Sequence, residues 1–270
     1  MPELPEVQTV LGGLAPVMEG YCFERVTLNR KDLRFAFAPR FKARLEGARI
    51  DAMTRRAKFL MLSLSTGETL LMHLGMSGRF TVNPEGGREK HDHVVFKMSS
   101  GATVVYNDAR RFGFMELFEA GPITRLDHLG PEPLSNHFNG PALRAALKAK
   151  KSPIKTALLD QRVVAGLGNI YVCEALYRAR INPRKLSGRL SAEQCGTLAA
   201  HIKDILTEAI KAGGSTLKDF VSADGELGYF QHSFDVYGRE GKPCRTCETP
   251  LTRISQSGRS TFYCAACQMD

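Results

Sequence analysis

The sequence predicts an α+β multidomain protein, with an N-terminal antiparallel β-sandwich that buries an N-terminal helix, then a helical domain, then a small cysteine hairpin. Three observations support this prediction. Short segments with strand patterning and regular turns occupy the first half of the chain, and segments with helical periodicity follow them. Two Cys-x-x-Cys pairs lie in the last 27 residues. We expect the domains to span residues 1–130, 131–236 and 237–270.

The first expected element is a helix near the N-terminus. Pro5 suits the first turn of a helix, where its missing N–H costs no hydrogen bond. The apolar residues that share one face at helical spacing are Leu4, Val7, Leu11 and Leu14. Gly12-Gly13 weakens the later turns. Burial of the apolar face would hold the residues before the helix in place.

The segment from residue 21 to residue 118 has the character of β-strands. The candidate strands are residues 21–29, 58–64, 68–74, 92–98, 102–107 and 113–118. Several of these segments alternate apolar and polar residues, and turn signals such as Thr66-Gly67 and Ser99-Ser100-Gly101 separate them. Short strands with regular turns predict an antiparallel sandwich or barrel.

After Gly130-Pro131-Glu132-Pro133 the pattern changes to that of helices. The candidate helices are residues 141–149, 153–160, 168–180 and 191–212. Ser191 and Gln194 have the spacing of a capping box at the start of the last of these, and Gly213-Gly214 would end it. Residues 215–236 are expected to form a loop-rich linker.

Charge and composition favour a polyanionic partner. The net charge is +9 and the sequence pI is about 9.3, a balance most often found in proteins that bind nucleic acid. A basic protein without such a partner has the same balance, so charge does not decide between the two. The chain contains no apolar run of membrane-spanning length and no signal peptide opens it. We therefore expect a cytoplasmic protein.

The cysteines indicate a metal site in a reducing compartment. Three of the seven, Cys22, Cys173 and Cys195, are scattered along the chain. The other four are Cys244, Cys247, Cys264 and Cys267. Each Cys-x-x-Cys turn places two thiolates on one tetrahedral Zn²⁺, and a hairpin between the pairs brings them together. Four thiolates leave no open position, so the expected Zn²⁺ is single and structural.

The second and third residues are candidates for catalysis. Removal of the initiator methionine would leave Pro2 with a terminal secondary amine, whose pKa is lower than that of lysine. Such an amine can attack a carbonyl-level carbon and form an iminium ion. Glu3 lies next to it and could move the protons that the reaction needs. The alternative interpretation is a disordered tail before a helix.

Several other residues have both a functional and a structural interpretation. Lys58, behind Arg55-Arg56, could point at a phosphate or a reacting sugar, or it could be a solvated residue at a strand edge. Asn169 follows Gly166-Leu167-Gly168 and could contact DNA or cap a helix. Arg259 is placed at or near the tip of the cysteine hairpin, where it could reach a phosphate or remain solvated.

The remaining candidate functional residues lie in two turns and in a His-Asp-His segment. Arg110-Arg111-Phe112-Gly113 is a basic and aromatic turn whose side chains could fill the space left by an extruded base, and Met76 lies in a turn flanked by glycines. Core packing is the alternative for Met76 and Phe112. In His91-Asp92-His93 the two histidines point to one side of an extended chain, which suits either a metal or a contact with a phosphate or base.

Taken together, these segments resemble formamidopyrimidine-DNA glycosylases over essentially the whole chain. The matching motifs are Met1-Pro2-Glu3-Leu4-Pro5-Glu6-Val7, Arg55-Arg56-Ala57-Lys58, His73-Leu74-Gly75-Met76-Ser77-Gly78, Lys90-His91-Asp92-His93, Asp108-Ala109-Arg110-Arg111-Phe112-Gly113, His128-Leu129-Gly130-Pro131-Glu132-Pro133-Leu134, Gly166-Leu167-Gly168-Asn169-Ile170-Tyr171, Gly213-Gly214-Ser215-Thr216-Leu217-Lys218-Asp219-Phe220 and the cysteine pairs. The resemblance implies a β-sandwich, a helix–two-turn–helix domain and a zinc ribbon.

The resemblance also implies the activity and the catalytic residues. Such a protein removes 8-oxoguanine and formamidopyrimidines from duplex DNA and then cleaves the strand as an AP lyase, leaving a one-nucleotide gap. By matching motif, Pro2 is the nucleophile and Glu3 the acid/base. Lys58 assists base loss and β-elimination, and Arg259 holds phosphates and assists δ-elimination.

The implied partner is damaged double-stranded DNA. The residues implied to contact it are His91, Arg110, Lys151 and Asn169, and those implied to fill the vacated base stack are Met76, Arg110 and Phe112. Residues 217–229 match the loop that closes over the flipped base. The resemblance further implies a monomer in the bacterial cytosol or nucleoid, with no nucleotide cofactor.

Two alternatives remain open at this point. An endonuclease VIII-like relative would prefer oxidised pyrimidines, although Leu4 and Val7 resemble the purine branch. A non-catalytic zinc-ribbon protein could use the same helices to bind damaged DNA.

Overall fold

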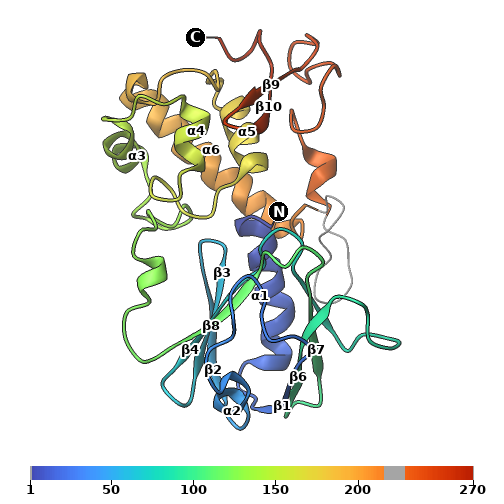
Figure 1. Ribbon diagram of the computed structural model, residues 1–270. Coiled ribbons are helices and arrows are strands. Elements are labelled where there is room, and N and C mark those ends of the chain that lie inside the picture. The colour runs from blue at the N-terminus through green and yellow to red at the C-terminus, as the bar shows by residue number, and fades with distance from the viewer. Residues whose placement is uncertain (1, 216–228, 270) are drawn as a thin grey trace. The chain divides into compact units, whose positions relative to one another are not determined.

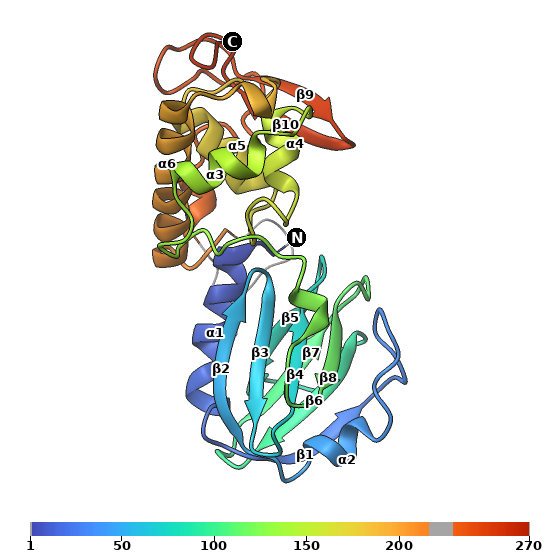
Figure 2. The same cartoon turned by 90° about the vertical axis from the view of Figure 1, so that its left-hand side faces the viewer.

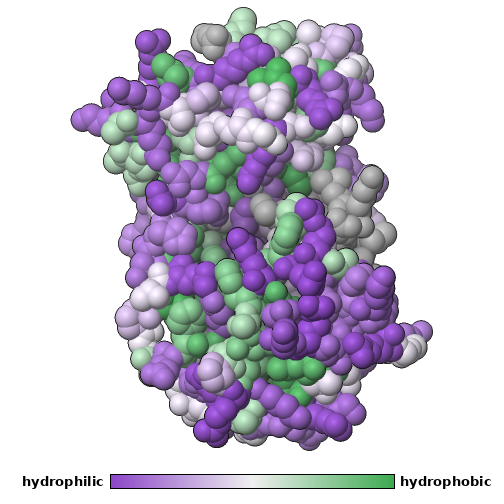
Figure 3. All heavy atoms as spheres, viewed as in Figure 1, coloured by the Kyte–Doolittle hydropathy of each residue, from purple (hydrophilic) through white to green (hydrophobic). Residues whose placement is uncertain are grey.

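The computed structural model describes residues 2–215 and 229–269 (Figure 1). The chain divides into two compact units, one formed by Met1–Thr124 and Ala212–Tyr229, the other by Arg125–Lys211 and Phe230–Asp270. No helix in the described ranges is long and apolar enough to cross a membrane. On the face shown in Figure 3, hydrophilic residues cover most of the surface.

The predicted N-terminal helix is confirmed as α1, Leu4–Met18. Pro5 lies in its first turn, and Glu3 is the N-cap in a capping box with Glu6. The helix continues through Gly12-Gly13 because its inner face is fully buried, and tertiary packing outweighs a weak local propensity. Its buried apolar residues include Leu4, Val7, Val10, Leu14 and Met18. Leu11, expected on this face, is only half-buried.

Two four-stranded antiparallel sheets form the predicted sandwich. One has the order β1-β6-β7-β5, with β1 Phe23–Leu28, β5 Arg79–Val82, β6 Asp92–Met98 and β7 Thr103–Asn107. The other has the order β2-β3-β4-β8, with β2 Ile50–Arg56, β3 Phe59–Leu64, β4 Thr69–His73 and β8 Phe114–Phe118. Buried side chains of both sheets and of α1 form one hydrophobic core. Figure 2 shows α1 beside β2, the strand it contacts most.

Three elements of this unit were not predicted. Strand β2 is bulged between Ile50 and Ala52, which breaks the alternation of buried and exposed residues. Strand β5 has only four residues. The short helix α2, Phe41–Leu45, buries only its two end residues and gives little periodicity to detect.

The four helices predicted for the second half are confirmed. They are α3 Gly140–Leu147, α4 Ile154–Leu159, α5 Asn169–Arg178 and α6 Ala192–Lys211. The capping box before α6 is present, because Ser191 and Gln194 exchange side-chain-to-backbone hydrogen bonds of 3.1 Å each. Short 3₁₀ turns lie at Thr124–Leu126 (η1), Ser187–Arg189 (η2) and Phe230–Ser233 (η3).

The cysteine hairpin is built from β9, Thr252–Gln256, and β10, Arg259–Tyr263. They meet at Ser257-Gly258, as predicted, and both turn residues have positive φ angles of 49° and 72°. This two-residue turn matches the twist of antiparallel strands. The hairpin packs with α5, and Cys173 and Tyr177 share a small hydrophobic cluster with Cys244, Leu251 and Cys264.

Candidate functional site

The N-terminal candidates are held in a buried, hydrogen-bonded position. Pro2 is buried and Glu3 is only 2% exposed. The Glu6 carboxylate links this end of α1 to a distant part of the same unit. Its Oε2 accepts the Glu3 backbone N–H at 2.9 Å, and its Oε1 accepts the N–H and the hydroxyl of Ser215 at 2.8 and 2.9 Å. The start of α1 is therefore not a disordered tail.

Lys58 lies in the turn between β2 and β3 and is only 8% exposed. A solvated strand-edge lysine would be far more exposed, so that interpretation does not fit. Arg55 ties this turn to α1, because its Nη1 donates to the Ala57 carbonyl at 2.8 Å and its Nε donates to Gln8 Oε1 at 2.9 Å. Ala57 has a φ of 53°, a left-handed conformation that the turn imposes just before Lys58.

Met76, Arg110 and Phe112 come together at two neighbouring turns of the same unit. The Arg110 guanidinium lies over the Phe112 ring, 4.9 Å from its centroid, and Phe112 is 42% exposed. They border an open hollow of about 590 Å³. Its lining is Leu33, Arg34, His73, Gly75, Met76, Arg110, Arg111 and Phe112. An exposed aromatic ring stacked with an arginine is not core packing, and it can meet a base.

The His91-Asp92-His93 segment does not form a metal site. Asp92 is buried and accepts a hydrogen bond from Asn107 Nδ2 at 2.8 Å, while His93 Nε2 is 2.8 Å from the carbonyl oxygen of Asp108. Both side chains are thus used within the sandwich. His91 is more exposed and remains available for a contact with DNA.

In the other unit, Asn169 and Arg259 lie on elements that contact each other. Asn169 is the first residue of α5, and its Nδ2 donates to the Ser260 carbonyl at 2.9 Å. Arg259, the neighbour of Ser260, is exposed at the first position of β10. Lys151 is also exposed, shortly before α4. The start of α5 and the hairpin tip therefore form one surface.

Sequence analysis did not identify Lys155, which supports this surface. It is fully buried, and its Nζ donates to the same Ser260 carbonyl at 3.2 Å. Burial lowers the pKa of Lys155, and the positive charge of Arg259 lowers it further. One feature of the sequence could have identified Lys155 as a buried residue. It lies between the apolar residues Ile154 and Ala157, on the buried face of a short helix.

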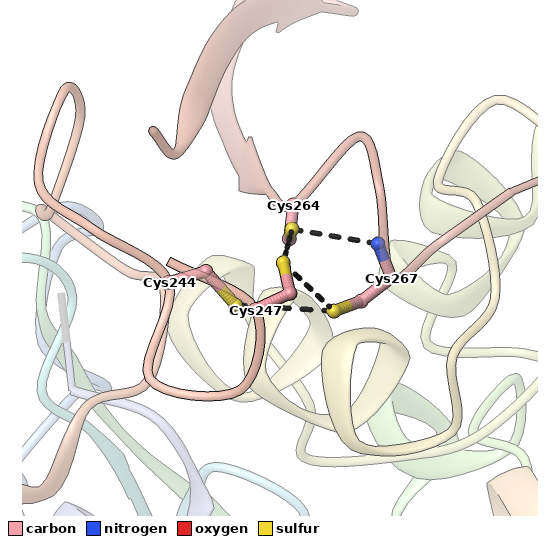
Figure 4. A group of neighbouring side chains, drawn as sticks. All are labelled: Cys244, Cys247, Cys264 and Cys267. Carbon is pink, nitrogen blue, oxygen red and sulfur yellow. Dashed lines mark hydrogen bonds between the residues drawn. The ribbon is translucent and has the colours of Figure 1, made fainter. Parts of the chain in front are cut away.

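The four cysteines form a cluster suited to one metal ion. Their sulfurs all lie within 4.8 Å of one another, and Figure 4 shows the side chains pointing toward a common centre. Tetrahedral zinc with Zn–S bonds of about 2.3 Å separates its sulfurs by roughly 3.8 Å. The pairs Cys244–Cys267, Cys247–Cys264 and Cys247–Cys267 lie at 3.9, 3.5 and 3.4 Å. The residues present therefore fit one structural zinc, as predicted.

Hydrogen bonds and burial shift the pKa values of the thiols in this cluster. Burial acts against ionisation of Cys244, but hydrogen bonds from the Tyr177 hydroxyl and from backbone N–H groups lower its pKa to about 6. Burial and the neighbouring thiols raise the pKa of Cys267 to about 12. Thiols this close resist ionising together, so a divalent cation among them offsets their repulsion. In residues 2–215 and 229–269 no other group of three His, Cys, Asp or Glu residues has such geometry.

Comparison with known proteins agrees with this arrangement. Three family models match in order: the formamidopyrimidine-DNA glycosylase N-terminal domain at residues 1–115, its H2TH domain at 129–221, and a zinc finger found in FPG and IleRS at 241–268. The chain belongs to the formamidopyrimidine-DNA glycosylase family. Relatives named formamidopyrimidine-DNA glycosylase from Ruegeria pomeroyi and Roseobacter denitrificans are 56% and 54% identical, each over 99% of this chain and the whole relative.

Solved structures of the formamidopyrimidine-DNA glycosylase family share the fold. The MutM (FPG) protein of Thermus thermophilus superposes with a TM-score of 0.89 at 40% identity, covering 99% of this chain and 98% of the other. A mutant Lactococcus lactis FPG in complex with Fapy-dG containing DNA has a TM-score of 0.89 at 33% identity, with both chains fully covered. A MutM complex with DNA containing carbocyclic 8-oxo-G has a TM-score of 0.88 at 33% identity. The predicted family and fold are confirmed.

The predicted loop over the flipped base, residues 217–229, lies outside the described residues except for Tyr229. Tyr229 is 66% exposed, and its N–H donates to the Ala212 carbonyl at 3.1 Å.

Proposed function

We propose that this protein is a base-excision-repair DNA glycosylase that removes oxidised purines, 8-oxoguanine and formamidopyrimidines, from duplex DNA and then acts as an AP lyase. Membership of the family and the lesion-containing DNA in two solved relatives support this activity. The observation that carries the proposal is the buried start of α1, where Pro2 is buried next to Glu3 and the Glu6 carboxylate accepts the Glu3 N–H. A secondary amine held this way is prepared to act as a nucleophile.

In the first step, the Pro2 nitrogen bonds to sugar C1′ once the initiator methionine has been removed. Glu3 protonates the ring oxygen of the sugar and the C1′–O4′ bond breaks. The C1′–N bond to the damaged purine also breaks, and the base leaves with the bonding electrons and takes up the proton that the Pro2 nitrogen loses. The product is an iminium ion between Pro2 and the opened sugar. Lys58, buried in the turn that Arg55 links to α1, assists base loss.

In the second step, the iminium ion acidifies the C2′ proton. Loss of that proton expels the 3′ phosphate by β-elimination, which Lys58 assists. A second elimination expels the 5′ phosphate and leaves a one-nucleotide gap. Arg259 binds the phosphates and assists this δ-elimination. The amine itself is the electron sink for both eliminations.

The remaining candidates bind and deform the duplex. We propose phosphate or base contacts for His91, Arg110, Lys151 and Asn169. Met76, Arg110 and Phe112 would fill the vacated stack, which offsets a flipping cost of a few kcal/mol. Each neutralised phosphate steepens the fall of affinity with salt by about 0.9 in the log–log slope.

One structural Zn²⁺ on Cys244, Cys247, Cys264 and Cys267 would support the hairpin that presents Arg259. We keep residues 1–130, 131–236 and 237–270 as the functional domains: catalytic sandwich, helix–two-turn–helix domain and zinc hairpin. We further propose that the protein acts as a monomer, without a nucleotide cofactor, in the bacterial cytosol or nucleoid.

Two assays on one preparation test the activity. Duplexes with 8-oxoguanine opposite C and duplexes with thymine glycol are incubated with the protein, and cleavage rates are compared. The proposal expects faster cleavage of the 8-oxoguanine strand, and the reverse preference would contradict it. Borohydride added during the reaction should link protein to the 8-oxoguanine duplex covalently. Binding without covalent capture would show a damage-binding protein instead.

A further inference from the structure

A buried carboxylate, Asp108, lies between the two turns that carry Met76, Arg110 and Phe112. It is fully buried. Its Oδ1 accepts the Ser77 hydroxyl at 2.6 Å, and its Oδ2 accepts the Gly113 N–H at 2.9 Å. Ser77 follows Met76 directly, and Gly113 follows Phe112 directly. One carboxylate therefore joins the neighbours of both apolar residues.

The hydrogen bonds continue from this carboxylate to Arg110. Ser77 Oγ accepts the Arg110 backbone N–H at 3.1 Å, so Asp108, Ser77 and Arg110 form a chain. The Asp108 carbonyl oxygen accepts the Arg111 N–H at 3.3 Å and lies 2.8 Å from His93 Nε2. Asp108 thus fixes its own turn through its backbone and the neighbouring turn through its side chain.

The two turns are also in direct steric contact. A Cβ added to Gly75 would lie 2.3 Å from the Phe112 carbonyl carbon, and one added to Gly113 would lie 1.8 Å from Tyr106 Oη. Tyr106 itself donates its hydroxyl to Asp108 Oδ2 at 3.3 Å. With no space between the turns, the orientation of Met76 relative to Phe112 is set by the bonds that join them.

We propose that Asp108 is a positioning residue that joins Met76, Arg110 and Phe112 into one preorganised wedge for base extrusion. The inference rests on the proposed function. A side chain that must be ordered during binding loses conformational entropy, whereas a preorganised one has lost it during folding. Asp108 touches no reacting atom in this account; it acts through the turns that it connects.

An amide cannot replace this carboxylate. In Asp108→Asn, the side-chain oxygen can accept from only one turn if the NH₂ group faces the other. With the oxygen toward Gly113, the NH₂ faces Ser77 Oγ and can donate only to its second lone pair, so the Ser77 hydroxyl hydrogen loses its acceptor. A neutral N–H···O bond then replaces the short charge-assisted bond between the turns, and the link is weakened while side-chain volume is kept.

The test compares two substrates. One duplex holds 8-oxoguanine, so a base must be extruded, with 2-aminopurine beside it to report extrusion by stopped-flow fluorescence. The other holds a preformed abasic site, where no damaged base has to leave the stack. Asp108→Asn and Ser77→Ala should slow extrusion and 8-oxoguanine excision roughly 10- to 100-fold, the effect of one or two lost buried hydrogen bonds. Cleavage at the abasic site should stay within about threefold of wild type.

Tyr106→Phe is the matched control, because it removes only the longest hydrogen bond to the Asp108 carboxylate and leaves both turns joined. Its extrusion rate should stay within about threefold of wild type. Ser77→Ala removes the same link without touching the buried carboxylate, so it tests the inference even if Asp108→Asn does not fold. Folded variants with wild-type extrusion rates, or with equal losses on both substrates, would overturn the inference. Wild-type protein that cleaves neither duplex would instead overturn the proposed function.

Discussion

The two compact units hold their functional candidates by different means. In the N-terminal unit, Pro2, Glu3 and Lys58 are buried, and the side chains of Glu6 and Arg55 form hydrogen bonds with the backbone around them. In the C-terminal unit, Arg259 is exposed on a two-stranded hairpin. That hairpin depends on four thiols and a few polar contacts with α5.

The two sites therefore depend on different sources of stability. Burial gives the N-terminal site its order, so its local structure should survive changes at the hairpin. A two-stranded hairpin is marginal alone, and metal binding supplies its folding free energy. The segment that leads into the hairpin is held by Glu174 of α5, whose carboxylate accepts the N–H groups of Asp235, Val236 and Tyr237 at 2.7 to 3.0 Å. Changes in one unit should leave the other folded.

Removal of zinc should have the largest effect in free energy, because it unfolds the hairpin. Structural zinc supplies on the order of 10 kcal/mol to small sites of this kind. Chelation should therefore unfold the hairpin and weaken DNA binding at least 10-fold, since each lost contact costs about 1–3 kcal/mol. Hydrogen exchange should show loss of protection in β9 and β10 with α1 unchanged. Full DNA affinity in zinc-free protein would contradict this role for the hairpin.

Replacement of Lys58 by Gln should slow the chemistry in the other unit. A group that assists proton transfer contributes about 10²–10⁴ in rate, and Lys58→Gln should lower single-turnover excision by that order. Lys97→Gln, an exposed lysine on β6, is the matched control and should keep the wild-type rate. An unchanged rate for Lys58→Gln would remove Lys58 from the mechanism.

Truncation of Leu14 should destabilise the N-terminal unit alone. Leu14 is fully buried in the core, and Leu→Ala changes at such positions cost about 2–5 kcal/mol. Leu11→Ala, on the same helix but half-buried, should cost less. The chain contains no Trp, so urea unfolding is followed by circular dichroism. An equal loss of zinc affinity in Leu14→Ala would show that the two units are not independent.

Removal of Arg259 should weaken DNA binding by about 1–3 kcal/mol and reduce the salt slope by about 0.9, the values for one phosphate contact. Arg245→Ala provides a control in the same unit, because Arg245 is exposed and pairs with Asp235 at 3.5 Å. Binding is measured over a range of salt concentrations. A wild-type slope for Arg259→Ala would place this side chain away from the phosphates.

Replacement of Asp160 by Asn should have the smallest effect on the free energy of unfolding. Its pKa is lowered: burial acts against ionisation, but hydrogen bonds from Lys150 and the Arg162 backbone outweigh it. Because the folded pKa lies below the unfolded one, the pair stabilises the fold above the unfolded pKa, and that contribution disappears as pH falls through the folded value. Asp160→Asn should cost at most about 1 kcal/mol at neutral pH, since the pair is partly exposed. Urea unfolding of wild type and Asp160→Asn at neutral and acidic pH measures this cost. A cost well above about 1 kcal/mol would show that the ion pair contributes more to this unit than its exposure predicts.

The elements that could be predicted from the sequence are those whose own residues carry a recognisable pattern. Helix α6 has a capping box and a regular apolar face, and the four cysteines have metal-site spacing. The bulged β2 and the four-residue β5 lack such signals and were missed. The supporting residues were missed for another reason, since Lys155 acts on Ser260, 105 positions away. The local sequence indicates at most that Lys155 is buried; its contact with Ser260 depends on tertiary structure.

The most direct test of the central claim is an intact-mass measurement of the protein before and after borohydride treatment with an 8-oxoguanine duplex. We expect a chain that begins at Pro2 and gains the mass of the trapped DNA strand, and we expect Pro2→Gly to suppress this adduct. A protein that keeps Met1 and still excises 8-oxoguanine and cleaves the strand at the full rate would rule out Pro2 as the nucleophile.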